Sequence, residues 1–391
     1  MKFPYRLPFV IDGKASCCDI TKDNPDDVCA EHRILCQPAL LISAKQSSVE
    51  NKVDSLLSPT GDIRHSRLRD LGFDEDFNRF ITELTAMCVK TGGEHIPTGG
   101  VITHKQTGRI EYKSPAFEDC YFSYLEKMAL LKEGGAQYIL LKNHKNLLHM
   151  RAGVLAAKTS KLPVFVVMEV DDEGKNEDDT DYIAALITLQ ALGAAAFGIY
   201  CKDGISAETA LIKRAFPHAE IPLIAVIDSL ADTEQQLQAV IENGASVLID
   251  IADNIQKHKI VFLKSLPVRY SPDTLKDSYA AAADREVFFL SDSLTLSEPL
   301  YCSYGMADEL IDLDDENINA IYIELTSADD ASCLADNADM TKLPFVIHSN
   351  DATAIEAALR YFQGRLIIDT KCDIDEPKLL ALAQKYGAIL Y

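Results

Sequence analysis

LPVFVVMEVDDEGKNEDDTDYIAALITLQALGAAAFGIYC, residues 162–201, is the stretch that decides the fold of this chain. Residues 162–167 form a short apolar run rich in Val and Phe, which predicts a strand buried on both faces. After an acidic loop, residues 182–192 carry apolar side chains at helical spacing and stop at Gly193, a typical helix-ending residue. A second apolar run follows at residues 194–200. Strand, helix and strand together predict a βαβ unit, the building block of parallel sheets.

Apolar runs of strand length recur along the first 283 residues and alternate with helical patterns. The predicted strands are residues 7–13, 38–44, 94–102, 136–142, 162–170, 194–201, 221–228 and 245–252. Helical spacing is clearest at residues 117–133, 147–160, 207–215, 233–243 and 254–266. Eight strands that alternate with helices predict a (β/α)8 TIM barrel over residues 1–283, with functional residues where the strands end.

The rest of the chain, residues 284–391, predicts a second and smaller α/β unit. Its apolar runs lie at residues 287–290, 318–325, 343–347, 366–368 and 388–391, with helical stretches at 351–362 and 376–386. Five strands are too few to close a parallel barrel, so we expect an open, doubly wound parallel sheet. The open edge and apolar faces of such a sheet predict a homo-oligomer, or else close packing against the first barrel.

The amino-acid composition limits which partners the protein can bind and which cellular compartment it is expected to occupy. The net charge is −22, from 60 acidic against 38 basic residues, which argues against nucleic acid and against anionic membranes as partners. No stretch approaches eighteen consecutive apolar residues, and the start of the chain lacks a long apolar segment, so we expect a cytoplasmic protein. The ten cysteines include no CxxC pair, and in a cytosolic chain most of them are expected to be reduced.

The βαβ unit of residues 162–201 resembles the barrel of the homocysteine S-methyltransferase family, which is also the N-terminal module of cobalamin-dependent methionine synthase. The second strand of this unit ends in Gly198, Ile199, Tyr200 and Cys201, and in the family a glycine opens and a cysteine closes the same motif. The resemblance continues over residues 3–271 in the same order. Residues 343–391 resemble the middle of the pterin-binding barrel that follows this module in methionine synthase.

The resemblance implies a zinc ion held by three cysteines. The zinc ion lowers the pKa of the homocysteine thiol, and its fourth coordination position is left open for that thiol. Cys201 matches the cysteine that ends the sixth strand in the family. The family's adjacent Cys-Cys pair at the end of the eighth strand corresponds here to Ile251 and Ala252, and no cysteine lies between Cys201 and Cys302. We therefore expect the zinc-thiolate site to be lost or altered, and zinc to be held only by a relocated site.

Other strand ends also depart from the family. Asp12 and Gly13 keep its residues at the end of the first strand and are candidate substrate-binding residues, whereas residues 44–47, 142–143 and 227–230 differ from its motifs. In the second unit, His348 and Asp369 stand where the pterin-binding barrel has Asp and Asn. We therefore do not expect folate or a corrinoid to be bound as a cofactor.

Two sets of residues leave alternatives open. Cys17 and Cys18 lie beside the end of the first strand, so they could join Cys201 in a relocated metal site, or they could be loop residues without a function. His104, near the glycine-rich third strand, could act as an acid–base group or serve as a structural histidine.

Three functions fit these observations. The first is a homocysteine S-methyltransferase-like protein of one-carbon metabolism whose zinc chemistry is lost or altered. The second is a non-catalytic partner of a corrinoid or other methyl-transfer protein. The third is a zinc-free barrel enzyme of new specificity that uses Cys201. The sequence assigns no catalytic residue.

Overall fold

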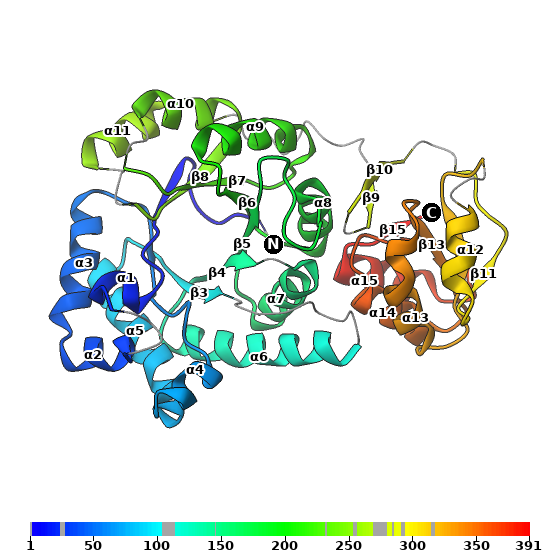
Figure 1. Ribbon diagram of the computed structural model, residues 1–391, viewed down its shortest axis with the longest axis horizontal. Helices are drawn as coiled ribbons and strands as arrows, with labels where there is room; N and C mark the ends of the chain where they lie inside the picture. Colours follow the sequence, from blue (N-terminus) through cyan, green and yellow to red (C-terminus); the bar gives the residue numbers. More distant parts are fainter. Residues whose placement is uncertain are drawn as a thin grey trace.

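The computed structural model describes residues 2–23, 28–103, 114–144, 146–230, 233–252, 256–268, 280–283, 285–290, 294–313 and 317–391. Three positions singled out from the sequence lie outside these ranges, namely His104, the expected start of a helix at residue 254 and the expected boundary at residue 284. Within the described residues, the chain forms an eight-stranded parallel sheet, a two-stranded hairpin and a five-stranded parallel sheet. Figure 1 shows the five-stranded sheet beside one flank of the larger unit.

The larger sheet is the expected (β/α)8 barrel. Its strands are β1 (Phe9–Asp12), β2 (Leu56–Leu57), β3 (Thr98–Thr103), β4 (Tyr138–His144), β5 (Val164–Val170), β6 (Ala196–Cys201), β7 (Leu223–Ile227) and β8 (Ala245–Asp250). They pair in parallel in the order β1-β8-β7-β6-β5-β4-β3-β2. Hydrogen bonds from Asp12 N to Ser55 O (3.0 Å) and from Ser55 N to Val10 O (3.2 Å) join β1 to the start of β2, and they close the ring.

Helices surround the barrel strands. They are α1 (Cys17–Thr21), α2 (Ala30–Cys36), α3 (Ala39–Glu50), α4 (His65–Asp70), α5 (Phe77–Gly92), α6 (Ser114–Glu133), α7 (Leu147–Ser160), α8 (Tyr182–Leu192), α9 (Ile205–Ala215), α10 (Glu234–Glu242) and α11 (Lys257–Ser265), with 3-10 turns at Asp74–Asp76 and Phe216–His218. Capping side chains and glycines determine where several of these helices begin and end. The Asp181 carboxylate accepts hydrogen bonds from the first backbone N–H groups of α8, and Gly193 ends that helix with a φ of 112°.

The second predicted strand is wrong. Residues 39–44 belong to helix α3, which begins directly after Pro38. Proline is well tolerated at a helix start, because the first backbone N–H groups have no partner within the helix. The true second strand, β2, has only two residues, which is too short for a recognisable apolar run. The other seven barrel strands overlap the predicted ranges.

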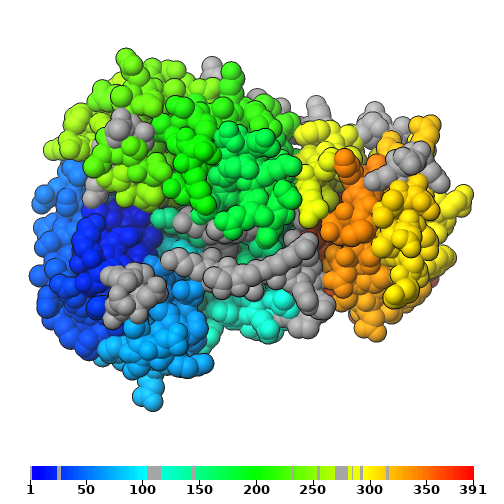
Figure 2. Space-filling view, viewed as in Figure 1, coloured from blue at the N-terminus to red at the C-terminus, as the bar shows by residue number. Residues whose placement is uncertain are grey.

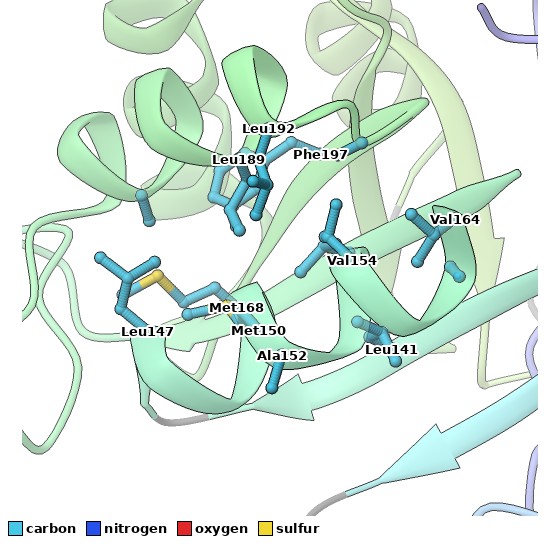
Figure 3. Close-up of a cluster of buried hydrophobic side chains, with 14 of the residues drawn as sticks. Leu141, Leu147, Met150, Ala152, Val154, Val164, Met168, Leu189, Leu192 and Phe197 are labelled. Atoms are coloured by element: carbon cyan, nitrogen blue, oxygen red, sulfur yellow. The ribbon is translucent and has the colours of Figure 1, made fainter. Parts of the chain in front are cut away.

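Two apolar layers stabilise the barrel. The interior is filled by alternate strand residues such as Phe165, Val167 and Ile249, and Phe3 and Tyr5 from the N-terminal segment stack on Phe165 and Phe9 respectively. The other strand face packs against the helices. Figure 3 shows this outer layer where α7 and α8 cover strands β4 to β6. Both faces of each strand are therefore buried, as the continuous apolar runs predicted.

The second unit contains β9 (Ala280–Ala282), β10 (Val287–Phe289), β11 (Leu300–Tyr301), α12 (Met306–Leu313), β12 (Ile321–Glu324), α13 (Asp330–Asn337), β13 (Phe345–His348), α14 (Ala352–Tyr361), β14 (Ile367–Ile368), α15 (Glu376–Tyr386) and β15 (Ile389–Leu390), with a 3-10 turn at Ala338–Met340. Strands β11 to β15 form a parallel sheet in chain order. Right-handed crossovers between strands in chain order place the connecting helices on one face. The expected doubly wound arrangement, with helices on both faces, is therefore wrong, and the unit is an open partial barrel. The predicted strand at residues 287–290 exists as β10, but it pairs with β9 in an antiparallel hairpin outside this sheet.

The helix-free face of the second sheet is covered by the chain that precedes it. Ala281, Leu290, Leu294 and Leu296 pack against a row of sheet residues that includes Val346, and Ala282 exchanges backbone hydrogen bonds with Arg365. Apolar surface that a closed barrel would bury in its interior is thus buried by the connecting segment.

The opposite side of the second unit packs on the barrel (Figures 1 and 2). The guanidinium group of Arg151 on α7 donates to Leu359 O (2.7 Å) and Arg360 O (3.1 Å), which are backbone carbonyls in the last turn of α14. Arg360 in turn donates to both carboxylate oxygens of Glu118 on α6. One continuous apolar cluster includes side chains of both units. The second unit is therefore packed tightly on the barrel, while a homo-oligomer stays a prediction.

Candidate functional site

Cys201 ends β6, at the carboxyl end of the barrel where the sequence predicted functional residues. However, Phe197, Ile199 and Cys201 pack in the outer apolar layer with the helices, whereas Tyr200 packs against the barrel interior. The thiol of Cys201 is 1% exposed and donates to Asp171 O at 3.5 Å. Burial raises the pKa of this thiol. Cys201 is thus a neutral thiol between the strand and the helix layer and does not face the mouth of the barrel.

Asp12 also faces the helix layer. It shares its strand face with Val10, which belongs to the outer apolar cluster, and its carboxylate forms a buried ion pair with Lys45 of α3 at 2.6 Å. The same ammonium group donates to Lys14 O at 2.8 Å. Because both charged side chains are almost completely buried, this ion pair fixes α3 to the end of β1. The carboxylate of Asp12, a candidate substrate-binding residue, therefore forms a structural ion pair with Lys45.

Gly13 allows a close approach between β1 and β8. Its backbone N–H donates to Asp250 O at 2.8 Å. A Cβ atom at position 13 would lie 2.5 Å from both Asp250 O and a methyl carbon of Ile251. The absence of a side chain at Gly13 is therefore required by the packing of the strand ends.

Cys17 and Cys18 lie away from Cys201. The buried Cys17 thiol donates to Pro59 O (3.3 Å), beyond the end of β2, whereas the contact of Cys201 lies beyond the end of β5. Burial raises the pKa of the Cys18 thiol to about 11. Across the described ranges, no group of three or more His, Cys, Asp and Glu side chains is placed to hold a metal ion.

The positions implied for the second and third zinc cysteines carry no ligand atoms. Ile251 packs its side chain against the barrel interior, and Ala252 donates its backbone N–H to the Asp250 carboxylate at 3.2 Å. Neither side chain can bind a metal. The donor set at the end of β8 therefore does not fit the zinc site of the family.

Four polar side chains lie on the strand face that points into the barrel mouth, namely Lys142 of β4, Glu169 of β5, Tyr200 of β6 and Asp228 after β7. The alternation of side chains along each strand places Lys142 on the face of Leu140, and Glu169 on the face of Val167, both of which belong to the interior cluster. The Tyr200 hydroxyl donates to the Asp228 carboxylate at 3.1 Å. We call these four residues the mouth cluster.

The electrostatic environment of the mouth cluster is mixed. Burial lowers the pKa of Lys142, although nearby carboxylates, with Asp19 the strongest, act in the opposite direction. Burial, reinforced by Asp228, raises the pKa of Tyr200 to about 12. Glu169 forms an ion pair with the exposed Lys202 at 2.5 Å. The barrel mouth thus carries the amino group of Lys142, the carboxylates of Glu169 and Asp228, and the Tyr200 hydroxyl, which stays protonated at neutral pH.

In the sequence, Lys142 and Asp228 stand out only as departures from family motifs, Tyr200 only as part of the motif that ends at Cys201, and Glu169 not at all. The mouth cluster could have been predicted from the alternation of side chains between the two faces of each strand. Residues two apart along a strand share a face, so interior residues at Leu140, Val167 and Val226 predict the same face for residues 142, 169 and 228.

In the second unit, the two residues that replace the pterin-binding pair bind each other. His348 Nδ1 lies 3.2 Å from Asp369 Oδ2, and the same oxygen accepts a hydrogen bond from the Tyr322 hydroxyl at 2.7 Å. The backbone N–H of Lys371 donates to the other carboxylate oxygen at 2.9 Å. Asp369 is therefore held by internal contacts at the carboxyl ends of strands β12, β13 and β14.

Comparison with known proteins agrees with the barrel fold. The family of homocysteine S-methyltransferases matches residues 17–257. The chain is similar in structure to the homocysteine methyltransferase MmuM from Escherichia coli. The metallated form has a TM-score of 0.54 at 15% identity and the apo form 0.52 at 12%, and both comparisons cover 66% of this chain and 95% of MmuM. At these identities the similarity supports the fold.

A sequence match of 27% identity over 107 residues links the chain to a methionine synthase of Mycobacterium leprae (strain TN). The matched stretch covers 26% of this chain and only 9% of that protein. The fold is that of a TIM-barrel protein. Because the family match covers more than half of its length, the chain belongs to the homocysteine S-methyltransferase family.

No helix in the described residues is both long enough and apolar enough to cross a membrane.

Proposed function

We propose that this chain is a methyl-transfer-related member of its family that binds an amino-acid ligand at the barrel mouth without thiolate–zinc activation. One observation carries the proposal. The two positions that should supply zinc thiolates are Ile251 and Ala252, and the third, Cys201, is directed into the helix layer with a protonated thiol. Without a metal, a substrate thiol keeps its ordinary pKa of about 8.5 and is mostly protonated at neutral pH.

The mouth cluster supports an amino acid as the ligand. Lys142 supplies an amino group that can donate hydrogen bonds to an α-carboxylate, while Asp228 and Glu169 supply carboxylates for an α-ammonium group. The structurally similar MmuM is a homocysteine methyltransferase, and homocysteine is the ligand that we propose first. The alternative of an enzyme that uses Cys201 without zinc has less support, because a buried thiol of raised pKa is a poor nucleophile.

The proposal also covers the setting of the protein. We propose a cytoplasmic location and a methyl-transfer or corrinoid protein as a partner, in keeping with the family. We propose neither folate nor a corrinoid as a resident cofactor. The net charge of −22 disfavours nucleic acid as a partner.

Two measurements on the full chain test the proposal. Elemental analysis after mild purification should find no stoichiometric zinc, and methionine formation from homocysteine should be undetectable with methyltetrahydrofolate or methylcobalamin as donor. One zinc per chain, or methionine formation that Cys201→Ala abolishes, would overturn the absence of thiolate–zinc chemistry.

Ligand binding is tested separately by thermal unfolding. Homocysteine or methionine at a hundredfold excess over its Kd should stabilise the chain by about 2.7 kcal/mol. Lys142→Met should remove this stabilisation, whereas Lys264→Met, which alters an exposed lysine paired with Asp54, should retain it. Equal stabilisation of both variants would show that the mouth cluster is not the binding site.

A further inference from the structure

Three sulfur-containing side chains gather in the second unit. Figure 1 shows two of the elements that carry or adjoin them, β11 and α12, on the side away from the barrel. The three side chains belong to Cys302, which directly follows β11, to Met306 at the start of α12, and to Cys333 on α13. We call these three residues the sulfur cluster. The Cys333 thiol lies 3.8 Å from the Met306 sulfur, and Cys333 is close enough to Cys302 to act on the pKa of its thiol.

Reciprocal backbone contacts hold the two thiols side by side. Cys302 donates to the carbonyl of Asp330, three residues before Cys333, at 3.5 Å. Cys333 lies 3.7 Å from the carbonyl of Ser303, the residue after Cys302. Each thiol therefore points toward the segment that carries the other. The arrangement is set by the packing of α13 against the loop between β11 and α12.

We infer that the sulfur cluster is a binding site for a soft monovalent metal ion, copper(I), with two thiolates and one thioether as ligands. Thiolate and thioether sulfur favour Cu(I), whereas zinc sites in proteins use thiolate, imidazole and carboxylate ligands. Three sulfur atoms around one ion, at a metal–sulfur distance of about 2.3 Å like that of zinc thiolates, lie about 4.0 Å apart in a trigonal plane. The observed sulfur–sulfur distance of 3.8 Å matches this geometry.

The surroundings suit such a site. The Asn337 side-chain amide donates to Cys333 O at 2.8 Å and lies 3.7 Å from the Cys333 sulfur, where its N–H can stabilise a thiolate. Met306 is completely buried, while Cys302 and Cys333 are half-buried, so an ion can reach the thiols and bind against the thioether.

Binding exchanges protons for the metal. Cu(I) bonds to both thiol sulfurs and to the thioether, the two S–H bonds break, and two protons leave to solvent, so that no electron is transferred. Burial raises the pKa of the Cys302 thiol to about 12, which means that the metal must displace bound protons at neutral pH. With two protons released per ion, affinity should rise about 100-fold per pH unit below the thiol pKa values.

The test is a titration of the reduced full chain with Cu(I) under anaerobic conditions, in competition with a chromophoric Cu(I) chelator and with ascorbate as reductant. We expect one tight equivalent, three sulfur neighbours by X-ray absorption, and the stated dependence on pH. Cys302→Ser and Cys333→Ser should each weaken binding by about 100-fold or more, and Met306→Leu, which preserves apolar volume, by about 10-fold.

Two variants control for the other cysteines. Cys120→Ser changes a half-buried thiol on α6, and Cys18→Ser changes a thiol beside the first strand, and neither should affect the tight equivalent. The inference fails if no tight equivalent binds, if Cys18→Ser removes it, or if Cys302→Ser and Cys333→Ser bind like the unmodified chain. It also fails if mass spectrometry finds a disulfide between Cys302 and Cys333 in protein purified under reducing conditions.

Discussion

The contact between Arg151 and helix α14 gives the sharpest prediction about the stability of this protein. Arg151 is 1% exposed, and its guanidinium donates to two carbonyls in the last turn of α14, where helix carbonyls have no partner within the helix. A cation at this end of a helix is also favoured by the helix dipole. Burial lowers the pKa of Arg151 to about 10, so the side chain is still charged at neutral pH.

Arg151→Met preserves most of the aliphatic volume and removes both hydrogen bonds. Each hydrogen bond from a charged donor contributes about 1.5–3 kcal/mol, and the desolvation cost of the buried charge disappears with it, so we expect a net loss of about 3 kcal/mol. The loss should appear as a lower midpoint of denaturant unfolding, followed by circular dichroism of the full chain.

The matched control is Arg79→Met, since Arg79 lies on α5 with a side chain that is 55% exposed and pairs with Glu83 one turn away. An exposed pair of this kind contributes at most about 1 kcal/mol. If Arg151→Met shifts the midpoint no more than Arg79→Met does, the contact between the two units is not the stabilising feature described above.

Three further substitutions test other contacts. Arg360 lowers the pKa of Glu118, so their pair should stabilise the fold fully above the ordinary carboxyl pKa of about 4.3 and lose this effect as pH falls through the lowered value. The stability difference between the unmodified chain and Glu118→Gln should therefore shrink in urea unfolding as the pH falls below about 4.3, and a constant difference would contradict this. Glu208 accepts backbone N–H groups from both β6 and β7, so Glu208→Gln should lower thermal stability by about 1–3 kcal/mol, and an unchanged Tm would contradict this. Gly13→Ala should cost about 1–3 kcal/mol by overpacking against Ile251, measured by the same unfolding, and a neutral effect would show that the strand ends can separate.

The sequence predicted the barrel because its strands are buried on both faces and separated by amphipathic helices. Because both faces are apolar, the sequence could not predict which side chains at the strand ends face the barrel interior and which face the helices. In a continuous apolar run such as residues 194–200, nothing distinguishes the interior face from the helix face. Cys201 was therefore placed correctly along the chain, but the structure turns its side chain toward the helices.

Short secondary-structure elements and contacts between distant residues could not be predicted from the sequence either. A strand of two residues such as β2 leaves no periodic signal, and the apolar residues at the start of α3 resemble a strand equally well. The contact of Arg151 with α14 joins residues more than two hundred positions apart. An arginine within an apolar helix gives no indication of which distant carbonyls it will meet.

The strand ends of this barrel show how a family fold can be retained while its chemistry changes. Asp12 is bound to Lys45 of α3, and the backbone N–H of Cys201 is bound by the buried carboxylate of Glu208. At these two positions, which keep the residues of the family, a strand end is fixed to a helix. Replacing Asp12, which would leave Lys45 buried without its partner, should therefore reduce stability before it affects any reaction. A new specificity would instead be defined by the mouth cluster, which faces the barrel interior and in which Lys142 and Asp228 differ from the family motifs. Loss of ligand binding without loss of stability in Lys142→Met would separate these two roles.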